Sequence, residues 1–141
     1  MLIIRELFAG CARFDEIEAQ TGATAQMLAA RLKRLEAEGM IERRVYSRRP
    51  LRHEYFLTRM GREFHPIILA LRAWGETWCK GADEPLAVRM THHKCGTEIG
   101  LDGLCPTCRE IVQPSDMDAQ PIPEYAAERR RRQEAHKAQA R

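Results

Sequence analysis

The chain has 141 residues, 44% of them hydrophobic and 30% charged, which predicts one main globular domain with room for a small appendage. It has no uninterrupted apolar run of about 18 residues, and Arg5 and Glu6 interrupt its apolar start, so the sequence excludes a transmembrane helix and a secretory signal. Five cysteines, an odd number without an export signal, favour a cytoplasmic protein over a disulfide-bonded secreted one.

The net charge of +3 is distributed unevenly along the chain. Residues 24–62 contain ten Lys and Arg against four Asp and Glu, and residues 124–141 contain six basic against three acidic residues. Two interpretations of this separation remain open: a basic face that binds an anionic partner, and an ordinary solvated basic surface.

The first part of the chain predicts three helices, at residues 2–9, 13–20 and 25–38. A turn at residues 21–24 separates the second from the third, and Thr24 has the hydroxyl that a helix N-cap needs. In the third helix Leu28, Leu32 and Leu35 fall on one stripe at helical spacing, and Gly39 stands where a C-cap glycine belongs.

Two strand-like runs follow, at residues 40–46 and 54–58, and the loop between them contains Pro50 and three arginines. A last long helix is predicted over residues 59–79, with Pro66 as the point where it kinks or restarts. Its apolar face consists of Ile67, Ile68, Leu71, Trp74 and Trp78.

The order of these elements predicts a fold that is mainly α with a small β-hairpin wing, a winged helix-turn-helix, plus a small Cys/His zinc-ribbon-like C-terminal extension. We expect residues 1–81 to form the DNA-binding and dimerisation domain and residues 82–112 the Cys/His extension. Residues 113–123 are rich in Pro, Asp and Gln and predict a linker. Residues 124–141 lack an apolar stripe and predict a basic tail, disordered or helical.

The third helix has the properties of a recognition helix. If its leucines face inward, a narrow, alanine-rich side faces outward, and Gln26 in the first turn has an amide that can pair with the edge of adenine. Arg31, Lys33 and Arg34 suit phosphates or guanine. The alternative for this helix is the polar face of an ordinary surface helix. The wing favours DNA, because Arg48, Arg49 and Arg52 repel one another and require an anion.

Several motifs occur in order and carry a resemblance to a known family: R-E-L-F, R-F-x-E-I, L-x-x-R-L-x-x-L-E-x-x-G-x-I-x-R-R, Y-S-x-R-P and E-Y-x-L-T-x-x-G. About half of the chain resembles the HxlR-type winged-helix regulators, which are MarR-like, although it begins within what is usually their second helix. The resemblance implies a bacterial transcriptional regulator that binds double-stranded DNA as a homodimer, here through the 59–79 helix. The full predicted set of DNA contacts is Thr24, Ala25, Gln26, Ala29, Ala30, Arg31, Lys33, Arg34, Arg48, Arg49 and Arg52.

The segment from Thr91 to Arg109 contains an H-x2-C pair and a C-x2-C pair with nine residues between them, and each pair has the spacing of a metal knuckle. Four ligands of mixed imidazole and thiolate type predict a closed, structural Zn²⁺ site made of His92, Cys95, Cys105 and Cys108. His93 is the alternative to His92. Unliganded cysteines, a Cys105–Cys108 redox pair and another metal remain open as competing interpretations.

No arrangement of a nucleophile and a base is evident, and the phosphate-loop and H-E-x-x-H motifs are absent from the sequence, so we predict that the chain is not an enzyme. A sequence-specific regulator is the first hypothesis. The alternatives are a nonspecific nucleic-acid or protein interaction module, and a regulator switched by oxidation of Cys11, Cys79 or the C-x2-C pair.

Overall fold

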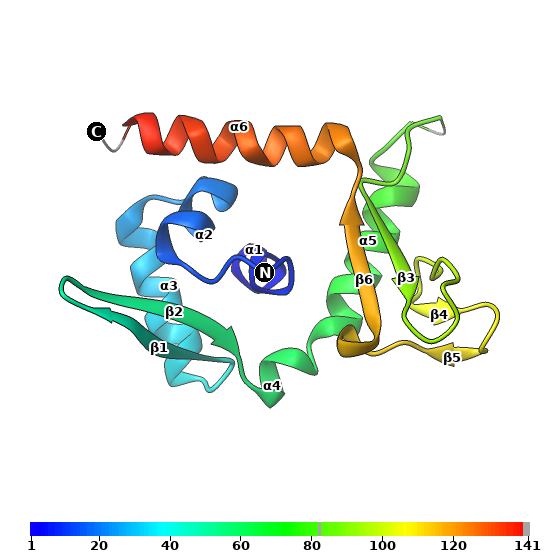
Figure 1. The fold of residues 1–141 in the computed structure, drawn as a ribbon, viewed down its shortest axis with the longest axis horizontal. Coiled ribbons are helices and arrows are strands. Elements are labelled where there is room, and N and C mark those ends of the chain that lie inside the picture. The colour runs from blue at the N-terminus through cyan, green and yellow to red at the C-terminus, as the bar shows by residue number, and fades with distance from the viewer. Residues whose placement is uncertain (82, 140–141) are drawn as a thin grey trace. The chain divides into compact units, whose positions relative to one another are not determined.

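The computed structural model describes residues 1–81 and 83–139, which form two compact units (Figure 1). The winged-helix unit consists of Met1–Glu63 together with Glu128–Arg141, and the cysteine-rich unit consists of Phe64–Ala127. Each unit has buried apolar side chains of its own. None of the helices in the described residues is long and apolar enough to cross a membrane.

The winged-helix unit contains the three predicted N-terminal helices, α1 (Leu2–Phe8), α2 (Phe14–Thr21) and α3 (Ala25–Ala37). Strands β1 (Ile41–Arg48) and β2 (Leu51–Leu57) and the short helix α4 (Arg59–Arg62) follow. Its core is aliphatic, because each helix turns one stripe inward. The buried members of this core are Ile3, Ile4, Ile17, Leu28, Leu32 and Ile41. The mainly helical fold with a hairpin wing is therefore confirmed.

The hairpin is longer than the sequence predicted. Strand pairing continues from Ile41↔Leu57 out to Arg48↔Leu51, so only Arg49 and Pro50 remain as the turn. The expected loop at 47–53 is thus mostly strand, because antiparallel backbone hydrogen bonds do not require apolar side chains on a solvated hairpin. The register shifts once, between Val45 and Ser47.

The predicted helix over 59–79 is two helices, α4 and α5 (His65–Trp78), and Pro66 lies in the first turn of the second one. Proline suits this position because its missing N–H has no partner in the first turn of a helix, so the predicted restart is confirmed. The apolar stripe of α5 does not face inward. Ile67 and Leu71 are each 47% exposed, Trp74 is 59% exposed and Trp78 is 74% exposed, whereas Leu69 on another side is buried.

The cysteine-rich unit contains two small antiparallel sheets. Strand β3 (Val88–His92) pairs with β6 (Met117–Pro121), and β4 (Leu104–Cys105) pairs with β5 (Glu110–Ile111). A 3-10 turn at Pro114–Asp116 precedes β6. The expected linker at 113–123 is therefore ordered for most of its length. The polar sequence of this segment gives no sign of a strand, because β6 is held by backbone pairing and carries mainly exposed side chains.

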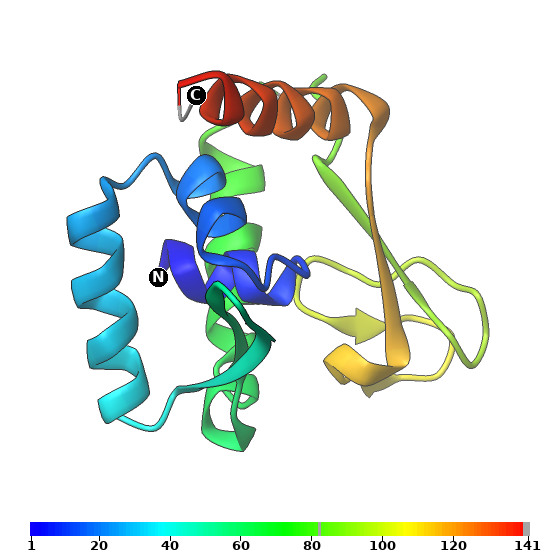
Figure 2. The same ribbon diagram turned by 60° about the vertical axis from the view of Figure 1, so that its left-hand side comes forward.

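The C-terminal segment is a helix, α6 (Pro123–Gln139), of which residues 128–139 belong to the winged-helix unit. The sequence left disorder and helix open for this segment. It has no buried residue and no apolar stripe, as expected. Within the winged-helix unit it is held to α1 and α2 by polar contacts (Figures 1 and 2).

Candidate DNA interface and metal cluster

The turn between α2 and α3 fixes where the third helix begins. Gly22 ends α2 with a φ of +65°, a backbone conformation that a side chain would strain. Thr24 is the N-cap of α3, as predicted, and its Oγ1 accepts a hydrogen bond from the Met27 N–H at 3.3 Å. These two local features direct α3 away from α2 and leave one side of it open to solvent.

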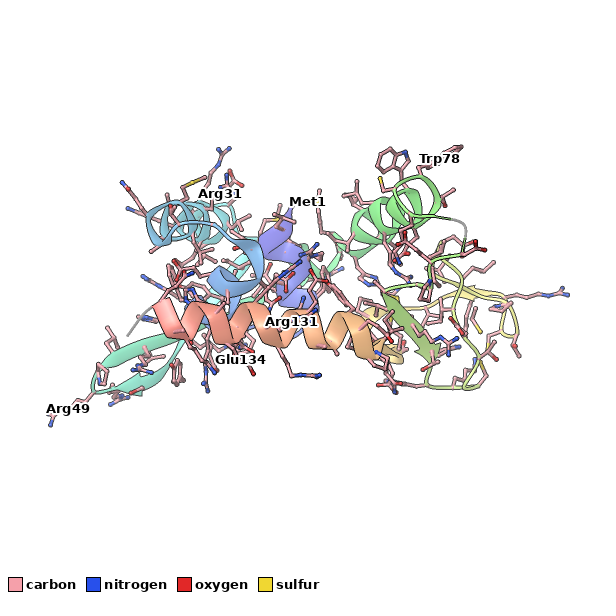
Figure 3. The ribbon with its side chains drawn as sticks, turned by 90° about the horizontal axis from the view of Figure 1, so that it is seen from above. Met1, Arg31, Arg49, Trp78, Arg131 and Glu134 are labelled. Carbon is pink, nitrogen blue, oxygen red and sulfur yellow. The ribbon has the colours of Figure 1, made fainter. Side chains whose placement is uncertain are left out.

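The predicted contact residues of α3 lie on that open side. Leu28 and Leu32 are 0% and 2% exposed and anchor the helix in the core. The residues predicted to contact DNA are all exposed: Thr24, Ala25, Gln26, Ala29, Ala30, Arg31, Lys33 and Arg34. Arg31 points outward in Figure 3. Of these residues, Arg34 has an acidic partner, because its Nε donates a hydrogen bond to Glu38 Oε1 at 2.8 Å.

The wing carries a second exposed basic group. Arg48, Arg49 and Arg52 are exposed, and Arg49 projects from the hairpin tip in Figure 3. Among the described residues, none of these three takes part in an ion pair with an acidic side chain. Glu54, on β2 next to the wing, accepts a hydrogen bond from Arg13 Nε at 3.3 Å. The positive charge at the tip is therefore left uncompensated by neighbouring carboxylates.

The strand arginines nearer the body of the domain differ from those of the tip. Arg43 Nε lies 3.1 Å from Glu36 Oε1, and Arg44 pairs with Glu42. The Arg44 guanidinium also lies over the ring of Phe56, 4.8 Å from its centroid. Charge alone would not distinguish these arginines from those of the tip, but their partners do.

A second group of candidate residues lies in the cysteine-rich unit. The structure brings together His92, Cys95, Cys105 and Cys108, whose ligand atoms all lie within 4.8 Å of one another. Cys95 Sγ is 3.5 Å from Cys105 Sγ and 3.5 Å from His92 Nδ1. A tetrahedral zinc ion with bonds of about 2.3 Å to sulfur and about 2.0 Å to nitrogen places its ligand atoms about 3.5–3.8 Å apart. The donor set and its spacing therefore fit zinc.

The two histidines of this segment have different surroundings. His92 is 4% exposed, on β3, and its ring belongs to the cluster. His93 turns the other way, and its Nε2 lies 3.1 Å from Asp118 Oδ1. His92 is the last residue of β3, whereas His93 begins the turn that follows, and the two side chains have different partners.

The thiols of the cluster influence one another. Hydrogen bonds from the side chain and backbone of Thr97 lower the pKa of Cys95 to about 6. Burial and the neighbouring sulfurs of Cys95 and Cys105 raise the pKa of Cys108 to about 11. One negative sulfur therefore opposes ionisation of the next, and a divalent cation removes that opposition because thiolates coordinate it.

The packing around the cluster is small. Cys105 is fully buried with Ile99 and Val112, and Met90, Cys108 and Met117 pack against them. A Cβ on Gly103 would lie 2.7 Å from Leu69 Cδ1, so α5 packs directly on the backbone between the two knuckles. So small a core needs an additional source of stability.

The profile of the HxlR-like helix-turn-helix family matches residues 1–83. The chain belongs to this family. A relative described as an HTH-type transcriptional regulator of Mycobacterium tuberculosis (strain ATCC 25618 / H37Rv) is 32% identical over 127 residues, which cover 90% of this chain and 80% of the relative. A regulator of the same description from Synechocystis is 40% identical over 79 residues, or 55% of this chain and 58% of that protein.

Among solved structures, that of PA1607, described as a transcription factor, is similar with a TM-score of 0.62 and 31% identity. The similarity covers 82% of this chain and 80% of that one. The HxlR-like chain is therefore an HTH-type, DNA-binding transcriptional regulator and not an enzyme. The predicted family is confirmed.

Two features of the HxlR-like chain escaped the sequence analysis. Met27 is 47% exposed on α3, one helical turn before Ala30 and Arg31, and helical spacing alone could have placed it on the outer face. Arg129, grouped by sequence with a basic tail, instead donates to the buried Glu6. Nothing in the local sequence signals that contact, because the two residues are 123 positions apart.

Proposed function

We propose that this HxlR-like chain is a sequence-specific DNA-binding regulator whose α3 enters the major groove. The observation that carries the proposal is the division of α3 into two sides. Leucines anchor one side in the core, and the other presents small and basic residues to solvent. Small side chains let a helix approach the base edges closely, and Gln26 offers the paired donor and acceptor that adenine requires.

The wing serves a different purpose in this proposal. Arg48, Arg49 and Arg52 contact the phosphate backbone or the minor groove and supply affinity that does not depend on sequence. Their lack of carboxylate partners among the described residues supports this role, since an unneutralised guanidinium gains most from a phosphate.

The test is fluorescence anisotropy of the full chain on two labelled duplexes of equal length at physiological salt. One is the DNA upstream of its own gene and the other is a scrambled version. We expect a preference of about 10³-fold or more for the native duplex. Comparable affinity for both duplexes would favour the alternative, a nonspecific interaction module.

The same assay tests the role of Gln26. Gln26→Ala removes the amide that reads a base, so we expect the preferred duplex to lose about 1–3 kcal/mol of binding free energy and the scrambled duplex much less. Gln113→Ala, at an exposed glutamine outside α3 and the wing, is the matched control and should change neither affinity. An equal loss on both duplexes would contradict base reading by Gln26.

We further propose that His92, Cys95, Cys105 and Cys108 hold a structural Zn²⁺ ion. Two pairs at knuckle spacing converge within 4.8 Å, and all four protein positions of a tetrahedron are filled, which leaves no open position for a substrate. When bound, the metal would cross-link β3 to the segment around β4 and supply order that the small core does not.

The exposed stripe on α5 supports the proposed homodimer. Ile67, Leu71, Trp74 and Trp78 recur at helical spacing and are between 47% and 74% exposed. A second copy of the chain is the occupant we propose, because the family resemblance implies a dimer through this helix, and large aromatic residues dominate the energetics of protein interfaces. Figure 3 shows Trp78 projecting from the end of α5.

The redox-switched alternative receives less support from the structure. Burial, followed by the negative charge of Glu6, raises the pKa of the Cys11 thiol. This disfavours the thiolate, which is the form that attacks an oxidant. Cys79, in contrast, is exposed at the end of α5, so its thiol is accessible to an oxidant. Binding assays with and without a reductant would separate the two hypotheses.

A further inference from the structure

The second half of α6 belongs to the winged-helix unit and runs beside α2 (Figures 1 and 2). This half carries four consecutive arginines, Arg129 to Arg132, which by sequence alone suggest a basic tail that adds affinity for DNA. The structure separates them. Arg130 and Arg131 are exposed, Arg132 pairs with Glu128 on the same helix, and Arg129 turns toward α1.

Arg129 neutralises a buried charge. The Glu6 side chain on α1 is 0% exposed, and its Oε2 accepts from Arg129 Nη2 at 2.6 Å, while its Oε1 accepts from Arg5 Nη2 at 2.6 Å. Burial by itself would raise the pKa of Glu6, but the hydrogen bonds and positive charges of Arg129 and Arg5 leave it below the ordinary value. A buried carboxylate without its partners would be strongly unfavourable, so Arg129 is part of the unit's interior.

Two further contacts join α6 to α2. Gln20, 6% exposed, donates from Nε2 to the backbone carbonyl of Arg129 at 2.9 Å. Two turns later along the helix, His136 Nε2 lies 3.3 Å from Glu18 Oε2. Arg129 and His136 are seven positions apart and therefore share one face of α6. The second half of α6 is thus held by polar contacts, which explains why it needs no apolar stripe.

The same face of α6 lies across a groove from the helix-turn-helix turn. Ala135, His136 and Gln139 line one groove together with Ala19 of α2 and with residues 22–24 of the turn. That turn includes Thr24, which caps α3. We propose that α6 is an intramolecular strap on the DNA-binding unit, and that Arg129 is a positioning residue that acts on α3 through Glu6, α2 and this turn.

The strap itself follows from the contacts, whereas its effect on DNA binding rests on the proposed role of α3. Both parts are tested in the full chain with Arg129→Ala, Glu6→Gln and the double variant. Arg130→Ala, at the exposed neighbouring arginine, is the matched control. The readouts are denaturant unfolding, amide hydrogen exchange over residues 14–24, and affinity for the native duplex at a temperature where every variant is folded.

We expect Arg129→Ala to increase the unfolding equilibrium constant about 100-fold or more, because it leaves Glu6 buried with one partner fewer. In the double variant, Glu6→Gln should restore most of the lost stability, since the buried charge is gone. The double variant should still bind the native duplex about tenfold more weakly than Glu6→Gln alone and should exchange faster at residues 22–24. Arg130→Ala should match the unsubstituted chain in stability and exchange.

Two results would overturn the proposal. If Arg129→Ala is as stable as Arg130→Ala, the strap contact does not form. If the double variant is folded and matches Glu6→Gln in both exchange and affinity, Arg129 balances charge but positions nothing. Should the unsubstituted chain show no preference for the native duplex, the proposed function fails separately, and exchange at residues 22–24 still decides whether the strap positions the turn.

Discussion

The winged-helix unit buries six aliphatic side chains from three helices and a strand. The cysteine-rich unit has a buried core of only Ile99, Cys105 and Val112, and Cys105 is also one of its four candidate metal ligands. In the first unit, hydrophobic burial supplies the stability, at about 25 cal/mol per Å² of apolar surface removed from water. In the second, so little apolar surface is buried that the proposed metal would contribute most of the order. If the proposed metal binds, one short chain uses two different sources of stability.

The largest expected effect is the loss of the metal. Cys105→Ser removes the most deeply buried sulfur of the cluster, and structural zinc in small domains contributes about 10–16 kcal/mol of apparent binding free energy. We expect the variant to lose its bound zinc and its amide protection over residues 88–112. Metal analysis of the purified chain and hydrogen exchange measure these two outcomes.

His93→Ala is the matched control for this test, because His93 pairs with Asp118 outside the cluster and should leave the zinc content unchanged. A Cys105→Ser variant that retains a full equivalent of zinc would show that the proposed ligand set is wrong. A chain that never contains zinc, with cysteines that react freely with a thiol reagent, would favour the unliganded interpretation.

The next largest effect is expected in the aliphatic core of the other unit. Leu28→Ala removes a side chain that is 0% exposed, and the lost burial and the cavity should together cost about 2–5 kcal/mol of unfolding free energy. Met27→Ala, at an exposed position of α3, is the control, and it should change the unfolding free energy by no more than about 0.5 kcal/mol. Denaturant unfolding gives both values. Similar values for the two variants would contradict the assignment of the inner and outer sides of α3.

The same contrast explains how much could be predicted from sequence. Burial of Leu28 and Leu32, the N-cap at Thr24 and the restart at Pro66 follow from helical periodicity and local backbone chemistry, which involve residues within a few positions of one another. The candidate metal cluster was also predictable, because its two pairs are each local. The spacing identified the four residues that the structure brings together.

Features that depend on distant partners could not be predicted in this way. Strand β6 has no alternating pattern, and its formation depends on pairing with β3, whose paired residues lie 25 to 33 positions earlier along the chain. The docking of α6 depends on Glu6, which by sequence resembles any charged residue of an N-terminal helix. The full length of the wing was missed for the same reason, since cross-strand hydrogen bonds extend it through polar residues.

A smaller effect is expected on self-association. Trp74→Ser removes a large aromatic side chain from the middle of the exposed α5 stripe. A central aromatic residue typically contributes about 2 kcal/mol or more to an interface, so the dissociation constant of the dimer should rise about 30-fold. Sedimentation across a concentration series measures the dissociation constant. Thr77→Ala, exposed on the same helix, should leave it unchanged. A chain that is monomeric before any substitution, at every concentration, would instead remove the proposed dimer.

The smallest expected effect concerns the wing. Within this one hairpin, an arginine of the tip can be compared with an arginine of the strands. Arg49→Ala removes a tip charge that has no carboxylate partner among the described residues, so the slope of log affinity against log salt should fall by about 0.9. Between about 50 and 200 mM salt, the variant should therefore lose about threefold less DNA affinity than the unsubstituted chain. Arg44→Ala removes a guanidinium that already pairs with Glu42, and its slope should change less. Because both residues belong to the same hairpin, equal slope changes would show that the whole hairpin, and not its tip, contacts the phosphates.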